Sequence, residues 1–221
     1  MKILITGTSR GIGKAIAIKF LNEGHEVYGM DRLKGDLHDA NYHHIICDVR
    51  DKDNFPVIKN IDIIINNAGT QNEDDIEINL RGAINVTEMF LNDAIKSVLF
   101  IGSASAHTGA EFPEYAASKG GLLSYTKNVA MRIAKYGATC NSLDPGGVLT
   151  DLNKPVIEDE ALWNEIMELT PLKRWATPAE IADWAYFLTF TNKFCTAQNI
   201  LVDGGEAAMF KFVWKECYHI T

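Results

Sequence analysis

Short apolar runs alternate with longer, helix-sized segments along most of the chain. The apolar runs have the length of strands and span residues 2–6, 25–30, 43–48, 61–66, 97–103, 138–144 and 199–205. Segments long enough for helices lie between them, at 12–22, 79–95, 115–135 and from Thr177 onward, where Thr177, Pro178 and Glu180 predict a capped helix start. Continuous apolar runs are typical of strands buried on both faces, and strands separated by helices predict βαβ units. The sequence therefore predicts an α/β fold with a doubly wound parallel sheet.

Length, charge and cysteine content narrow the class of protein. A chain of 221 residues suits one large domain, residues 1–221, which needs no disulfides to stay folded. Its 29 acidic and 21 basic residues give a net charge of −8, which argues against nucleic-acid and anionic-membrane partners. The cysteines form no CxxC pair, so we expect reduced thiols and no metal site. No apolar run could span a membrane and the chain enters a strand at once, so we expect a cytoplasmic protein.

A glycine-rich turn joins the first predicted strand to the first predicted helix. It reads TGTSRGIG at residues 6–13 and contains Gly7, Gly11 and Gly13. In an open parallel sheet this turn faces the crevice beyond the carboxyl ends of the strands. Its backbone N–H groups and the helix dipole favour a bound phosphate, although glycine-rich turns also serve as simple tight turns. The position between strand and helix favours the phosphate site.

Several further motifs follow this turn in a fixed order. They are NNAG at 66–69, Asn79 before a predicted helix, Ser103 after a predicted strand, YAASK at 115–119, Asp144-Pro145-Gly146 with Thr150, Arg174, and VDGG at 202–205. Together with TGxxxGxG, this series resembles the short-chain dehydrogenase/reductase family over about residues 1–205. The resemblance implies a Rossmann fold, a nicotinamide dinucleotide cofactor and an enzyme that interconverts an alcohol and a carbonyl compound.

Four residues are predicted to carry the reaction. Tyr115 and Lys119 are four residues apart and share one face of a helix. A nearby ammonium favours the phenolate, so Tyr115 can act as general acid or base for the carbonyl or alcohol oxygen. The resemblance implies that Ser103 donates a hydrogen bond to that oxygen, that Lys119 also binds the nicotinamide ribose, and that Asn79 holds a water of a proton relay. Ser105 is an alternative for this role, but Ser103 matches the family pattern better.

Cofactor choice is divided in the sequence. Asp31 follows the second predicted strand, where a carboxylate accepts hydrogen bonds from the adenosine ribose and repels a 2′-phosphate. Arg10 and Arg32 could instead pair with that phosphate. Asp31 acts at hydrogen-bond distance, so we expect NAD, with NADP less favoured. The cofactor-binding residues that the turn and the resemblance imply are Gly7, Ser9, Arg10, Gly11, Ile12, Gly13, Asp31, Arg32, Asp48, Val49, Asn66, Ala68, Gly69, Tyr115, Lys119, Pro145, Gly146, Val148 and Thr150.

The predicted activity is hydride transfer between NAD(H) and a secondary alcohol or a ketone or aldehyde. Two alternatives are an NADPH-dependent carbonyl reductase, such as a 3-oxoacyl thioester reductase, and a dinucleotide-binding sensor without turnover. The sequence departs from the family in two places. The segments between Asp48 and Asn66 and between Gly69 and Asn79 are shorter than is usual in the family, which predicts trimmed outer helices. The resemblance implies two-fold contacts through the helices at about 80–95 and 115–135. We therefore expect a homodimer or homotetramer that buries the apolar positions Ile84, Met89, Leu122, Leu123, Val129 and Ile133.

The remaining features allow more than one interpretation. His107 and Glu111 lie between Ser103 and Tyr115 and are either substrate contacts or solvated loop residues. The acidic run 73–77 is most simply a solvated helix start. An apolar lid over the substrate and ordinary amphipathic packing explain the segment after Thr150 equally well, on the positions Trp163, Ile166 and Leu169. The aromatic tail 206–221 is expected to pack on another surface.

Overall fold

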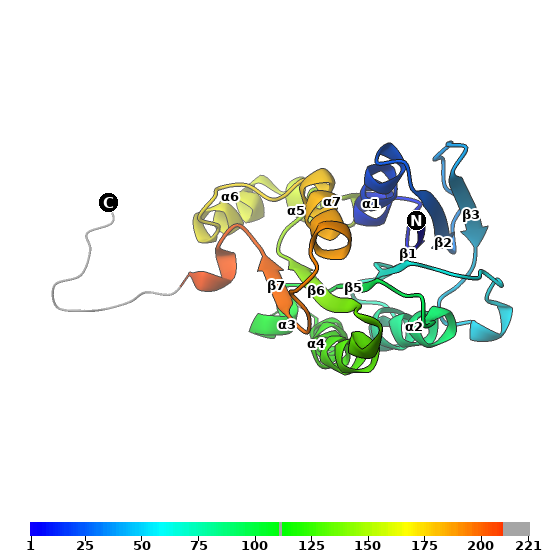
Figure 1. Ribbon diagram of the computed structural model, residues 1–221. Helices are drawn as coiled ribbons and strands as arrows, with labels where there is room; N and C mark the ends of the chain where they lie inside the picture. Colours follow the sequence, from blue (N-terminus) through cyan, green and yellow to red (C-terminus); the bar gives the residue numbers. More distant parts are fainter. Residues whose placement is uncertain (111, 210–221) are drawn as a thin grey trace.

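Seven parallel strands form one sheet in the order β3-β2-β1-β4-β5-β6-β7. The computed structural model describes residues 1–110 and 112–209 (Figure 1). Each predicted apolar run overlaps one strand: β1 (Lys2–Thr6), β2 (Glu26–Asp31), β3 (Tyr42–Ile46), β4 (Ile63–Asn66), β5 (Ser97–Ile101), β6 (Thr139–Pro145) and β7 (Asn199–Val202). β1 and β4 are parallel neighbours, and the chain builds the sheet outward from β1 on one side and from β4 on the other, so the strand order reverses between them. The fold prediction of a doubly wound parallel sheet is confirmed, and a ligand crevice is expected at this reversal.

Helices cover both faces of the sheet (Figure 1). One face carries α1 (Gly11–Asn22) and α7 (Pro178–Tyr186), which pack on each other. The other face carries α4 (Pro113–Ile133) and a π-helical segment (Ile76–Gly82) that continues into α2 (Ala83–Phe90). The short helices α3 (Ser105–Thr108), α5 (Lys154–Ile157) and α6 (Glu160–Leu169) lie beyond the strand ends. The remaining helical turns are Lys52–Asn54, Ala134–Tyr136, Asp151–Asn153, Phe187–Thr191 and Glu206–Ala208.

Alternate residues of each central strand face opposite helical layers. Ile3, Ile5 and Ile65 pack with Phe20 of α1 and Ile181 of α7. The intervening strand positions pack against the other layer, in a cluster that includes Leu4, Ile64, Val98, Phe100, Val86, Leu122 and Val129. Burying one such side chain stabilises the fold by about 1.5–3 kcal/mol, so the strand ends are held by a rigid core on both sides.

Two predicted helix boundaries have different outcomes. The predicted start of α7 is confirmed, because the Thr177 side chain accepts from the Glu180 backbone and the Glu180 side chain accepts from the Thr177 backbone. The helix predicted over 79–95 instead starts at Ile76 and ends at Phe90. Asn92 explains the early end, because its side chain donates to the Phe90 carbonyl and accepts from Ala94 N, which replaces a further helical turn.

The connection between β3 and β4 is short, as predicted, because the single helical turn Lys52–Asn54 stands where a longer helix is usual.

The predicted oligomer surface needs a correction. Leu122, Val129 and Ile133 are buried against the chain's own sheet and are not available to a second copy. Met89, by contrast, is half exposed on α2. Within residues 1–110 and 112–209, no helix is long and apolar enough to cross a membrane. The tail prediction falls mostly on 210–221, outside the described residues.

Candidate active site

The glycine-rich turn leaves the N-terminus of α1 open to ligand. Gly7 and Gly11 have φ angles of 76° and 57°, a region that favours glycine. Arg10 is the N-cap residue of α1, and within the described chain no side chain caps this helix and no acidic residue lies in its first turn. The first N–H groups of a helix lack intrahelical partners, and the helix dipole adds positive potential there. The turn therefore fits a phosphate group, as the sequence predicts.

Asn67 fastens this turn and was missed in the sequence. Its side-chain amide donates to the carbonyls of Thr6 (2.9 Å) and Gly7 (3.1 Å). Gly13 packs underneath, because a Cβ there would lie 2.0 Å from the Gly7 oxygen. Asn66, which the motif suggested as a cofactor contact, is buried in the opposite direction and donates to Thr87 Oγ1 at 3.0 Å. The two-residue period of β4 already indicates this orientation, because Asn66 lies on the same face as Ile64.

A cavity of about 910 Å³ extends across the carboxyl ends of the strands. Its lining contains most of the predicted cofactor and reaction residues: Gly7, Arg10, Gly11, Ile12, Asp31, Arg32, Asp48, Val49, Ala68, Gly69, Ser103, Tyr115, Lys119, Pro145, Gly146, Val148 and Thr150. Four predicted residues do not line it, namely Ser9, Gly13, Asn66 and Asn79. The cavity joins two chemically different regions. We call the region of Asp31, Arg32, Asp48, Arg50, Glu73 and Asp74 the charged end, and the region of Ser103, Tyr115 and Lys119 the buried end.

Asp31 organises the floor of the charged end. One carboxylate oxygen accepts from Ser9 N and the other from Leu33 N, each at 2.9 Å. These bonds hold the carboxylate between the glycine-rich turn and the end of β2. Each oxygen has further acceptor capacity toward the cavity, which suits the two hydroxyls of a ribose. Ser9 thus acts behind Asp31 and not as a lining residue.

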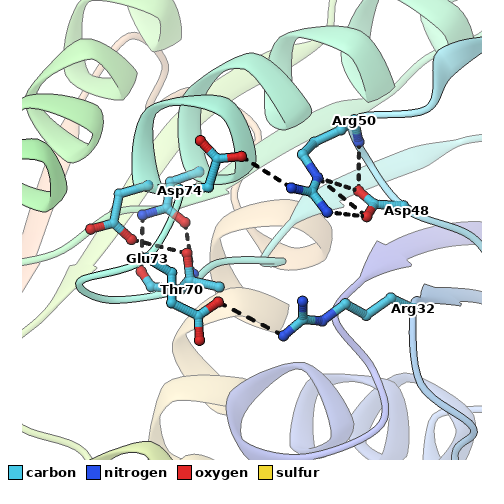
Figure 2. Close-up of polar contacts among 8 residues, drawn as sticks. Arg32, Asp48, Arg50, Thr70, Glu73 and Asp74 are labelled. Carbon is cyan, nitrogen blue, oxygen red and sulfur yellow. Dashed lines mark hydrogen bonds and ion pairs between the residues drawn. The ribbon is translucent and has the colours of Figure 1, made fainter.

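Two arginines connect the charged end to the segment after Gly69 (Figure 2). Arg50 donates to both carboxylate oxygens of Asp48 and also to Asp74 at 3.0 Å. Its guanidinium holds the pKa of Asp48 below the ordinary value. Arg32 lies 3.9 Å from the Glu73 carboxylate. The acidic run is therefore not a simple solvated helix start, because two of its carboxylates pair across the rim with arginines from distant strand ends.

Tyr115 and Lys119 form the centre of the buried end. Both come from the first turns of α4, and their spacing places the Lys119 ammonium 5.6 Å from the centre of the Tyr115 ring. Lys119 Nζ also donates to the Ile101 carbonyl at 2.9 Å, although the residue is only 5% exposed. A buried ammonium held beside a phenol stabilises the phenolate. The pair can therefore hold or release a proton at the tyrosine oxygen.

Ser103 lies at the end of β5 on the cavity wall. Its hydroxyl donates to Ser105 Oγ at 3.2 Å and accepts from Ser105 N at 3.1 Å. Both serines line the cavity and both are buried. The preference for Ser103 over Ser105 stays a prediction, and the hydrogen bond between them means that a change at either residue affects the other.

Asn79 lies behind the cavity wall in the π-helical segment. Its side chain accepts from Thr70 N at 2.8 Å and donates to Thr70 O and to Ser118 Oγ. A Cβ on Gly69 would lie 3.0 Å from Asn79 Oδ1 and 3.6 Å from Lys119 Nζ, so glycine at this position lets both groups approach the same point. π-Helical turns frequently occur at functional sites because they redirect a side chain. Here the turn brings Asn79 to the rear of the Lys119 site.

The two C-terminal motifs support the site from outside. Gly146 approaches Asp203 so closely that a Cβ would lie 2.9 Å from the Asp203 backbone. Asp203 in turn accepts from Gly205 N and Ala207 N. Arg174 binds the Glu180 carboxylate through two nitrogens, next to the start of α7. The close approach of Gly146 to Asp203 holds the start of the loop between β6 and α6, which forms one wall of the cavity, and Arg174 secures the segment between α6 and α7.

A second wall of the cavity is apolar. It includes Phe112, Val156, Leu162, Ile166 and Trp175. Of the positions proposed for a lid, Ile166 lines the cavity, whereas Trp163 supports the wall by packing edge-on against Trp175 at 5.0 Å. Leu169 is half exposed and does not line the cavity. Ile166 is thus in a position to contact substrate and Trp163 packs within the chain, and the lid over substrate stays a prediction. Glu111 lies outside the described residues.

Comparisons with known proteins agree with this geometry. Residues 7–206 match the family model described as enoyl-(acyl carrier protein) reductase. The chain is 30% identical to the 3-oxoacyl-[acyl-carrier-protein] reductase MabA of Mycobacterium bovis, over 92% of this chain and 91% of the relative.

Two solved structures share the fold and differ in the bound cofactor. One, from Agrobacterium tumefaciens and assigned as a 2-deoxy-D-gluconate 3-dehydrogenase, contains NADP and superposes with a TM-score of 0.85 at 27% identity, covering 94% of this chain and 96% of the other. The other, a 3-oxoacyl-[acyl-carrier protein] reductase of Brucella melitensis, contains NAD and has a TM-score of 0.77 at 25% identity, with coverages of 92% and 90%. With its fold, its glycine-rich turn and its match over nearly the full length, the chain belongs to the short-chain dehydrogenase/reductase family and is an NAD(P)-dependent oxidoreductase.

Proposed function

We propose that this enzyme interconverts a secondary alcohol and a ketone, or an aldehyde and its alcohol, with NAD(H) as the preferred cofactor. The observation that carries the proposal is the placement of the Tyr115–Lys119 pair and of Ser103 on the walls of the same cavity as the open N-terminus of α1. A dinucleotide whose pyrophosphate lies at that helix end can extend along the cavity toward Tyr115.

Each residue of the buried end has a distinct role in this proposal. Tyr115 gives a proton to the carbonyl oxygen during reduction and takes it back during oxidation. Lys119 stabilises the phenolate by its charge. Ser103 donates a hydrogen bond that holds the reacting oxygen. The cofactor, when bound, supplies or accepts the hydride. Asn79 stays outside the cavity, where it supports a proton path from Lys119.

The preference for NAD rests on two carboxylates at the charged end. Asp31 faces the position of the adenosine ribose and would repel a 2′-phosphate. Arg32, which could attract that phosphate, already lies beside Glu73. Arg10 is the remaining cation of the turn, and it is exposed. Two negative charges near the ribose therefore oppose the two arginines that favour NADP.

The apolar wall supports a substrate with an apolar body beside its carbonyl group. A 3-oxoacyl thioester reductase that uses NADPH is the second candidate, and the names of relatives such as the Mycobacterium bovis protein favour it. The third candidate, a sensor without turnover, does not need the proton-transfer residues that this chain contains.

We also propose that the chain forms a homodimer or homotetramer. Light scattering at micromolar concentration tests this, because a species of 24.5 kDa would contradict it.

Parallel kinetics test the proposed function. Initial rates are measured with NADH and NADPH on a panel of apolar ketones, aldehydes and 3-oxoacyl thioesters, and with NAD and NADP on the matching alcohols. We expect kcat/KM to be at least about tenfold higher with NAD(H), a difference of about 1.4 kcal/mol. A preference for NADPH together with a 3-oxoacyl thioester would establish the second candidate instead. Cofactor binding without turnover on any member would favour the sensor.

A further inference from the structure

A fully buried carboxylate lies directly behind the buried end and has no role in the proposed reaction. Asp144 belongs to β6 and is 0% exposed. Its Oδ2 lies 2.6 Å from His107 Nε2, whereas its Oδ1 is without a hydrogen-bond partner among residues 1–110 and 112–209. Burying a carboxylate is costly unless it is paired, so the fold keeps this group at the expense of stability. The pairing with His107 therefore needs a reason.

The backbone makes room for Asp144 at Gly102. A Cβ at residue 102 would lie 2.0 Å from Asp144 Oδ1, so no other residue fits without moving the carboxylate. Gly102 N also donates to the Leu143 carbonyl at 2.8 Å, which joins the ends of β5 and β6 at this point. Gly102, Asp144 and His107 thus form one unit between the two strand ends.

This unit anchors α3, the short helix that follows Ser103. A helix of four residues is not stable by itself, because nucleation outweighs the few bonds that it forms. Two contacts join the α3 region to β6: Ala104 N donates to Pro145 O at 2.8 Å, and His107 contacts Asp144. The same region supplies Ser105, whose backbone N–H donates to Ser103 Oγ. The position of α3 therefore sets the direction of the Ser103 hydroxyl.

Neither His107 nor Asp144 lines the cavity, although their neighbours Gly102, Ser105 and Pro145 do. Direct contact with substrate is thus not the role that the geometry favours. The charged group that faces Asp144 besides His107 is Lys119, whose positive charge favours the ionised carboxylate. Asp144 is therefore near the cation of the proposed proton-transfer pair and also contacts the segment that follows the serine.

We propose that His107, held by Asp144, is a positioning residue that fixes the orientation of Ser103 toward the reacting oxygen. This inference rests on the proposed function, because it assigns His107 an effect only through Ser103. Loss of the contact releases α3 and turns the Ser103 hydroxyl away from the cavity. Neither His107 nor Ser103 is among the expected cofactor contacts, so cofactor binding remains unchanged.

A double-mutant cycle tests the proposal. The variants are His107→Ala, Ser103→Ala and their combination, with His107→Gln as a conservative variant whose amide N–H can still reach Asp144. His43→Gln, an exposed histidine on β3, is the matched control. The measurements are kcat and KM on one accepted substrate, the Kd of NADH by fluorescence, and Tm to establish that each variant folds. The cycle isolates the coupling between the two residues.

We expect Ser103→Ala to lower kcat by about 10²-fold, as loss of an oxyanion donor does. His107→Ala should lower kcat by at least about tenfold in the parent, because a displaced group costs rate steeply. In the Ser103→Ala background it should cost less than about twofold. His107→Gln should retain most of the activity, and the Kd of NADH should not change in any variant.

The outcomes separate the two levels of inference. Full activity of Ser103→Ala would overturn the role of Ser103 in the proposed function. A large loss in Ser103→Ala with no loss in His107→Ala would overturn the positioning role alone. Equal losses from His107→Ala in both backgrounds would also overturn it, since they would show a general structural effect. If His107→Ala does not fold, His107→Leu, which fills a similar space but has no N–H for Asp144, replaces it in the cycle with the same expected and contradicting outcomes.

Discussion

The two ends of the cavity hold their polar groups in opposite ways. At the charged end, the side chains of Arg32 and Glu73 are 51% and 57% exposed and lie 3.9 Å apart. At the buried end, Lys119 and Ser103 are 5% and 6% exposed and make hydrogen bonds to strand ends and to α3. Exposed ion pairs contribute little free energy and exchange partners readily, whereas buried groups are fixed by every neighbour. We therefore expect that single substitutions at the charged end can change the preference for NAD or NADP. Single substitutions at the buried end should lower the rate and should not change the type of reaction.

The difference follows from the elements that supply each end. The buried end comes from β5 and α4, whose side chains fill the core between the sheet and one helical layer. The charged end comes from the residues after β2 and β3 and from the short segment after Gly69 (Figure 2). Because that segment is short, Glu73 and Asp74 reach the rim opposite the arginines. The short segment after Gly69 thus allows the Arg32–Glu73 and Arg50–Asp74 contacts.

Replacing the proton donor gives the largest expected effect at the buried end. Tyr115→Phe keeps the ring and deletes the hydroxyl, so kcat/KM should fall by about 10²–10⁴-fold. The Kd of NADH, measured by fluorescence, should stay within about twofold, because the charged end and the glycine-rich turn are unchanged. Tyr136→Phe, on an exposed tyrosine that does not line the cavity, is the control and should keep full activity. Near-full turnover of Tyr115→Phe would remove the tyrosine from the mechanism.

Asp31 offers the clearest test of the charged end. Asp31→Ser removes the carboxylate that opposes a 2′-phosphate, so the ratio of kcat/KM for NAD over NADP should fall by about tenfold or reverse. Turnover with the better cofactor should remain, since the buried end is intact. The substitution also removes the acceptor for Ser9 N and Leu33 N, so Tm is measured in parallel. An unchanged ratio in a folded variant would show that Asp31 does not face the ribose.

Glu73 should have a smaller effect of the same sign. Glu73→Gln leaves Arg32 without its acidic neighbour, so the Kd of NADP should improve by about two- to fivefold, the range that an exposed ion pair of up to about 1 kcal/mol allows. The Kd of NAD should not change. Asp74→Asn is the matched control, because it neutralises the next residue in the same segment but pairs with Arg50. If both substitutions changed the Kd of NADP equally, the effect would come from the net charge of the segment and not from the Arg32–Glu73 pair.

The fold prediction is confirmed, and the residues predicted for the buried end line one cavity, because the signals for both are local. The roles of those residues stay predictions. Each strand run carries its own apolar pattern, and the spacing of Tyr115 and Lys119 on a helix fixes their shared face. Prediction from the sequence failed where position depends on distant segments. Glu73 was interpreted as a solvated acid because Arg32 comes from another strand end. Asp144 was recognised only as part of the Asp144-Pro145-Gly146 turn, because its partner His107 and the space at Gly102 lie across two strands. Asn67 is different, since the period of β4 could have separated it from Asn66.

The smallest expected effect is a pH-dependent change of stability at Asp144. Burial is the largest influence on this carboxyl and raises its pKa above the ordinary value of 3.8, more than its contact with His107 lowers it. The folded state therefore keeps the proton to a higher pH than the unfolded state, so folding loses stability as the pH rises from about 4 through the raised pKa.

Asp144→Asn is neutral at every pH and its amide oxygen can still accept from His107, so its Tm should gain on the parent enzyme as the pH rises from about 4 to about 7. Thermal unfolding across that range measures the difference between the two Tm values. A difference that shrinks toward neutral pH would mean that an ionised pair with His107 offsets the cost of burial. The buried end would then gain stability from its charges and not merely tolerate them, and the contrast with the charged end would be weaker than the exposures alone indicate.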